Sequence, residues 1–135
     1  MASRRTASLK ACLDGMPGAR AEPMRSVLIY KVMGKMFAVL SVRGEANVIL
    51  KCDPELAEGL RETYSGVSQR SHLDPRFWIS VTLDADVPAR EIKRLATHSY
   101  EQVCAKLTKK QKADLLRVER VQVVDHPGDA PDENE

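Results

Sequence analysis

The stretch KVMGKMFAVLSVRGEANVILKCDPELAEGLRETY, residues 31–64, holds two apolar runs, a glycine turn and a helix start in direct succession. The runs KMFAVLSV and ANVILKC flank RGE, which has the glycine and the length of a tight hairpin turn. Asp53 and Pro54 then provide a capping residue and a proline suited to the first helical position. The stretch therefore predicts an antiparallel pair of strands followed by a helix.

The segments before and after this stretch add further elements. Apolar residues recur at helical spacing over residues 6–16, and Pro17 and Gly18 end that helix. After a loop, the β-branched run SVLIYKV, residues 26–32, predicts a strand. Glycine, serine and proline in residues 65–75 predict another loop.

The second half of the chain adds a strand and a long helix. Residues 76–83, RFWISVTL, alternate so that one face of the strand is buried and the other carries Trp78, Ser80 and Thr82. Pro88 begins a helix with one apolar stripe, formed by Ile92, Leu95, Ser99, Val103 and Leu107. We expect the Ser99 hydroxyl to bond back to a carbonyl of its own helix.

The order of these elements predicts the fold class. Beyond Thr108 the pattern fits either a closing helix or a helix followed by a short strand. The elements before it alternate between strands joined by hairpins and helices with one apolar face. This order predicts an α+β fold, an antiparallel β-sheet with helices packed on one face.

Length and composition favour one domain. A chain of 135 residues with 43% hydrophobic and 30% charged residues has the composition of a globular domain with a single core. We expect this domain to span residues 1–124 and residues 125–135 to form an acidic disordered tail. No apolar run is long enough to cross a membrane, so we expect no membrane partner and a cytoplasmic location. The cysteines at 12, 52 and 104 form no CxxC pair, and we interpret them as reduced structural residues.

The charges are distributed unevenly along the chain. Residues 125–135 contain five acidic residues and no lysine or arginine, so residues 1–124 hold 21 basic against 14 acidic residues. A basic domain is suited to an anionic partner, although such an excess also serves solubility alone. Charge by itself does not decide between these two interpretations.

Four segments in order resemble one known family. The segments KVMGKMFAVL, LKCDPELAEGLRETYSGV, SHLDPRFWISVTLDADVP and SYEQVCAKLTKKQ are similar to those of the YjbR/MmcQ family of small bacterial proteins. The similarity runs from about residue 8 to residue 111. Three departures stand out: Met33 replaces a common second glycine, Phe77 replaces a frequent histidine, and the chain after residue 112 lies outside the pattern.

The resemblance implies a CyaY-like fold and, by likeness to a "double wing" DNA-binding domain, a role in DNA binding. That implied role follows from shape, and one fold supports many functions. The residues themselves suggest where contact would occur. If Val48 and Leu50 face the helices, Lys51 and Trp78 lie on the open face of the sheet, with Lys35 at its rim.

We therefore expect the protein to bind duplex DNA through its backbone by a basic sheet face, with little base readout. Aromatic residues are only 4% of the chain, too few for stacking on single-stranded bases. The acidic tail is expected to compete with phosphate for the same surface. The expected contacts are Lys35, Lys51, Arg70, Arg76, Lys93 and Arg94.

The alternative is a module that binds a small ligand or a protein partner in a pocket near His72 and Trp78. The structural interpretation of both residues stays open beside it: His72 as a satisfied loop residue, Trp78 packed under residues 65–75. No nucleophile, base and acid come together in the sequence, and no metal-ligand cluster is visible. We expect no enzymatic activity, no cofactor and no metal, and a monomer or weak dimer.

Overall fold

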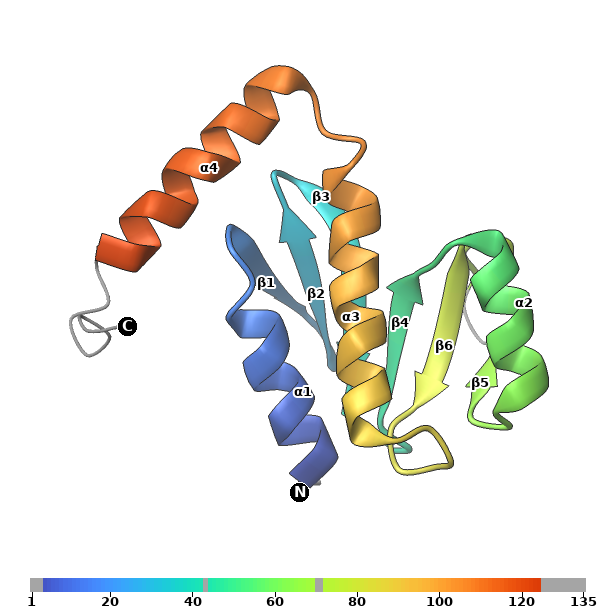
Figure 1. Ribbon diagram of the computed structural model, residues 1–135. Helices are drawn as coiled ribbons and strands as arrows, with labels where there is room; N and C mark the ends of the chain where they lie inside the picture. Colours follow the sequence, from blue (N-terminus) through green and yellow to red (C-terminus); the bar gives the residue numbers. More distant parts are fainter. Residues whose placement is uncertain (1–3, 43, 70–71, 125–135) are drawn as a thin grey trace.

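A computed structural model describes residues 4–42, 44–69 and 72–124 of the chain. Its centre is one six-stranded antiparallel sheet in the order β1-β2-β3-β4-β6-β5 (Figure 1). The strands are β1 (Ala19–Met24), β2 (Val27–Val32), β3 (Lys35–Ser41), β4 (Asn47–Lys51), β5 (Val67–Ser68) and β6 (Trp78–Thr82).

Helices cover one face of this sheet. α1 (Arg4–Asp14) and α3 (Ala89–Cys104) pack side by side, and α3 lies across β3 and β4 (Figure 1). α2 (Pro54–Thr63) lies beside β5, and α4 (Lys109–Val124) leads away from the end of α3. The prediction of an α+β fold with helices on one face of an antiparallel sheet is confirmed.

The two hairpins at the centre of the sheet depend on positive backbone φ angles. Met33 and Gly34 join β2 to β3 with φ of +50° and +79°. Positive φ at both residues of a two-residue hairpin turn gives the turn the same twist as the strands that it joins. Gly44, with φ of +70°, lies in the turn predicted between β3 and β4. The register of β3 on β4 pairs Ala38 with Leu50 and so points both toward the helices.

α2 begins as its sequence predicts. The carboxylate of Asp53 accepts hydrogen bonds from the backbone N–H groups of Glu55 (3.1 Å) and Leu56 (3.3 Å). Pro54 follows at the first helical position. Ala57 and Leu60 then bury one face of the helix against the domain.

The apolar stripe predicted for the long helix forms the centre of the core. Each member of that stripe is at most 5% exposed. On the sheet side, Phe37 lies against the rings of Tyr30 and Tyr100, at centroid distances of 6.2 Å and 5.4 Å. The hydroxyl of Tyr100 donates to the carbonyl of Pro17 (2.5 Å), which fastens α3 to the loop after α1.

Two segments differ from the expected local structure, and a third takes one of the two structures that its sequence fitted. Residues 19–24, expected as loop, form β1, and Val67–Ser68 within the second expected loop form β5. The segment after Thr108, which fitted two structures, is helical as α4. Leu115 packs α4 against the domain, because its side chain is buried against Gly18. A Cβ atom added at Gly18 would lie only 2.5 Å from Cδ1 of Leu115. The expected tail, residues 125–135, lies outside the described residues.

Candidate nucleic-acid interface

The face of the sheet away from α1 and α3 is apolar along its middle. Ile29, Val39 and Ile49 lie in register on neighbouring strands, and Ser80 continues the same row. Lys31 also lies on this face, but its ammonium pairs with the Glu22 carboxylate at 3.0 Å. The middle of this face is therefore apolar, and Arg20 and Lys51, which alternate onto the same face, lie at its edges; a basic sheet face stays a prediction.

The outward polar residues of β6 are not exposed. Ser80 is 2% exposed and Thr82 is 9% exposed, although both alternate with the core residues Ile79 and Val81. Trp78 is half-buried. Strand alternation predicts which face a side chain points to, but it does not predict whether neighbouring segments cover that face.

Three lysines belong to one end of the sheet, the upper end in Figure 1, where β3 and β6 begin and β4 ends. Lys35 opens β3, Lys51 closes β4, and Lys106 follows the end of α3. Burial first, then the nearby charges of Lys106 and Lys35, lower the pKa of Lys51. We call these three residues the lysine cluster.

No carboxylate in the described part of the chain pairs directly with the lysine cluster. None of its three ammonium groups forms an ion pair there. The repulsion that lowers the pKa of Lys51 is therefore not relieved by those residues. An anion that binds between these groups gains their combined attraction.

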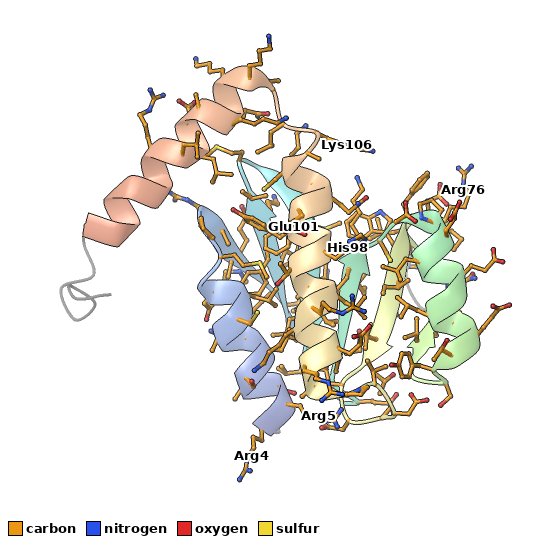
Figure 2. The ribbon with its side chains drawn as sticks, viewed as in Figure 1. Arg4, Arg5, Arg76, His98, Glu101 and Lys106 are labelled. Atoms are coloured by element: carbon orange, nitrogen blue, oxygen red, sulfur yellow. The ribbon has the colours of Figure 1, made fainter. Side chains whose placement is uncertain are left out.

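Two side chains of α3 fix the backbone that carries Lys51. The Ser99 hydroxyl accepts from the N–H of Lys51 (2.8 Å) and donates to the carbonyl of Phe37 (2.5 Å). Nε2 of His98 accepts from the N–H of Asp53 (3.2 Å), and Figure 2 shows His98 directed from α3 toward β4. The expectation that Ser99 bonds within its own helix is wrong, because β3 and β4 offer a carbonyl and an N–H group that face α3.

Arg76 lies at the same end of the molecule as Lys106 (Figure 2). Arg76 precedes β6 by two residues, and Trp78, the first residue of β6, pairs with Lys51. Its guanidinium stacks over Phe77 at 5.3 Å from the ring centroid and pairs with the Asp74 carboxylate at 2.8 Å. Arg76 thus adds a cation at this end that is already partly neutralised.

The remaining predicted contacts lie elsewhere. Lys93 and Arg94 belong to the first half of α3, on the helical side of the sheet, and Arg94 pairs with Glu91 at 2.6 Å. Arg70 lies outside the described residues. The six predicted contacts therefore do not form one surface. Among those that the structure describes, Lys35, Lys51 and Arg76 lie at the upper end.

In the described part of the chain, His72 and Trp78, the two residues of the ligand-binding alternative, form no hydrogen bond or ring contact with each other. His72 is exposed and Trp78 is half-buried in β6. A hollow of about 380 Å³ opens nearby between α2 and the segment before β6, but neither residue lines it; its walls are Pro54, Glu58, Arg61, Glu62, Gln69, Pro75 and Arg76. Binding at His72 and Trp78 stays a prediction.

More lysines follow the cluster along the chain. Lys109, Lys110 and Lys112 are exposed in the first turn of α4. Thr108 and Gln111 cap that turn reciprocally, since the Thr108 N–H donates to Gln111 (3.0 Å) and the Gln111 N–H donates to the Thr108 hydroxyl (3.1 Å). Lys106 and these residues are not among the contacts predicted from the sequence, although the run KLTKKQK marks them as basic.

Comparisons with known proteins identify the family. The model of the YjbR family matches residues 14–102, which is more than half of the chain. This chain belongs to the YjbR family. It is 35% identical over 89 residues to the Escherichia coli K12 protein named "Uncharacterized protein YjbR", covering 65% of this chain and 75% of that protein. A second relative, from Escherichia coli O157:H7, has the same name and the same identity.

Solved structures share the fold of this YjbR chain. The crystal structure of Deinococcus radiodurans protein DR2400, with a DUF419 domain, aligns with a TM-score of 0.75 and 30% identity, over 81% of this chain and 86% of that one. A Pseudomonas syringae protein aligns with a TM-score of 0.60 and 20% identity, over 72% and 96%. Among the helices within residues 4–42, 44–69 and 72–124, none has the length and apolar character needed to cross a membrane.

Proposed function

We propose that this YjbR protein is a non-enzymatic DNA-binding protein of the cytoplasm that grips the duplex backbone through the lysine cluster. The observation that carries the proposal is the meeting of Lys35, Lys51 and Lys106 from three different parts of the chain, with no carboxylate partner among the described residues. Lysine neutralises phosphate as a point charge and imposes little geometry. Such contacts fix a protein on DNA without reading its sequence.

The energetics of the cluster favour an anionic partner. Part of the cost of holding Lys51 charged arises from Lys35 and Lys106, and a phosphate between them removes that cost. A duplex presents phosphates at regular short spacing, which suits a surface that carries several cations at one end. The exposed lysines at the start of α4 extend the same surface.

The proposed contact surface revises the set of residues predicted from sequence. Lys35 and Lys51 remain at its centre, Lys106 joins them, and Arg76 lies at its edge. Lys93 and Arg94 are left out because they lie on the first half of α3. The few aromatic residues of the chain, 4% in all, favour backbone contact over base stacking.

A matched pair of triple variants tests the proposal. One variant neutralises the lysine cluster (K35Q, K51Q and K106Q), and the control neutralises the start of α3 (R90Q, K93Q and R94Q), with the same change in net charge. Anisotropy titrations of a labelled duplex at low salt should show binding weakened about tenfold or more for the first variant and nearly unchanged for the control. A duplex of scrambled sequence should give the same result.

Thermal unfolding of both variants serves as the folding control. The cluster variant should melt no lower than the wild type, because it removes repulsion around Lys51. Absence of duplex binding by the wild type at low salt, or equal weakening by both variants, would overturn the proposal.

A further inference from the structure

An apolar groove of about 380 Å³ lies between the last turns of α3 and the first half of α4. Its apolar lining consists of Cys104, Ala105, Leu107, Leu115 and Leu116. Leu107 and Leu115 are buried, whereas Leu116 is 57% exposed. We infer that this groove packs against the same groove of a second copy of the chain, so that two copies form a two-fold symmetric dimer through α3 and α4.

α4 has little support from its own domain. Figure 1 shows this helix of 16 residues leading away from the sheet and from α3. Of the α4 side chains that the structure describes, only Leu115 is buried, and it lies against Gly18. In proteins, most of the stability of a helix comes from packing one apolar face against other elements. The groove side of α4 therefore has contacts still to make.

The two walls of the groove have the same arrangement of residues. On α3, Glu101 is followed by apolar residues at the third and fourth positions after it, Cys104 and Ala105. On α4, Lys112 is followed in the same way by Leu115 and Leu116. Residues at this spacing share one face of a helix, so each wall presents one charge beside a pair of apolar side chains.

The opposite charges of the two walls favour a second copy as the occupant. Neither Glu101, labelled on α3 in Figure 2, nor Lys112 forms an ion pair within the described part of the chain. In a two-fold dimer, the α3 wall of one copy faces the α4 wall of the other, and the Glu101–Lys112 contact occurs twice. The groove thus carries both halves of the contact that a self-complementary interface needs.

Sedimentation equilibrium of the full chain over a concentration series tests the dimer without DNA, so the result does not depend on the proposed function. The wild type should show a monomer–dimer equilibrium, and L116E should weaken association about tenfold or more, because it places a charge in the apolar contact. The matched controls are M24E and V42E, at side chains that are 58% and 51% exposed outside the groove. These controls should change association by less than about twofold.

A pair of charge reversals tests which residues meet. E101K alone and K112E alone should each weaken association about five- to tenfold, because each sets like charges against one another at both contacts. An equimolar mixture of the two variants should associate about as tightly as the wild type, because both contacts then join opposite charges. Circular dichroism of each variant checks that it is folded.

Three results would overturn the inference. The first is a wild type that stays monomeric at every concentration. The second is a dimer that M24E or V42E weakens as much as L116E does. The third is a mixture of E101K and K112E that associates no better than either variant alone.

Discussion

At the scale of single residues, Ser99 links the helical layer to two strands. Its hydroxyl accepts from Lys51 and donates to Phe37, and the side chain is fully buried. Helical spacing places Ser99 on the apolar stripe of α3, as found. Its hydrogen-bond partners could not be predicted in the same way, because they are set by how β3 and β4 approach the helix.

Replacing Ser99 by alanine should destabilise the fold. The change leaves the part-buried N–H of Lys51 and the buried carbonyl of Phe37 without their partner, at a cost of about 1–3 kcal/mol each, so we expect a loss of about 2–6 kcal/mol. Urea unfolding of S99A measures it. The control is T97A, whose exposed hydroxyl donates only to the Lys93 carbonyl of its own helix, with an expected change within about 0.5 kcal/mol. Similar stability for S99A and T97A would contradict the bridging role.

At the scale of elements, sequence patterns predicted the central hairpin, α1, α2 and α3. The hairpin follows from two apolar runs around a glycine turn, and α2 from Asp53 and Pro54. β1 was missed because ARAEPM is polar, contains proline and is exposed at five of six positions. β5 was missed because two residues are too short to show a period.

Two glycine substitutions should have opposite effects on stability. A Cβ atom at Gly34 would meet nothing within 4 Å, but φ is +79°, so G34A should destabilise by about 1 kcal/mol or more through backbone strain. Gly59 also has open space and lies inside α2, so G59A should stabilise by about 0.5–1 kcal/mol. Thermal unfolding measures both. The same sign for the two changes would contradict the turn assigned to Met33 and Gly34.

The segment around β5 should respond to acid through Asp86. Hydrogen bonds from the backbone of Gly66 first, and then from Ser65, lower the pKa of Asp86 below its ordinary value of 3.8. A lowered pKa in the folded state adds stability above the ordinary pKa and loses it as pH falls through the lowered value. D86N should therefore be less stable than wild type near neutral pH, with the difference shrinking below pH 3.8.

Melting temperatures of D86N and of the neighbouring variant D84N across the acid and neutral range provide the comparison. Asp84 is exposed and accepts no side-chain hydrogen bond among the described residues. A constant gap between D86N and wild type across that range would show that Asp86 does not act as an ionised acceptor.

At the scale of the whole molecule, the fold places lysines from distant parts of the sequence at one end of the sheet. The composition of the chain predicts a basic domain, and the strand pattern predicts Lys35 and Lys51 as contacts. That Lys106, after the end of α3, belongs to the same end could not be predicted, because it depends on how the helix crosses the sheet. Lys93 and Arg94 were predicted for the same surface because the sequence shows their charge but not their end of the molecule.

The salt dependence of duplex binding tests the central claim most directly. Anisotropy titrations over a salt series give the slope of log K against log salt for the wild type, the cluster variant K35Q/K51Q/K106Q and the α3 variant R90Q/K93Q/R94Q. Each lost phosphate contact reduces the steepness by about 0.9, so the cluster variant should be shallower by about 2–3 units and the α3 variant unchanged. A wild-type slope near zero, or the same slope for all three proteins, would contradict the assignment of the lysine cluster to DNA.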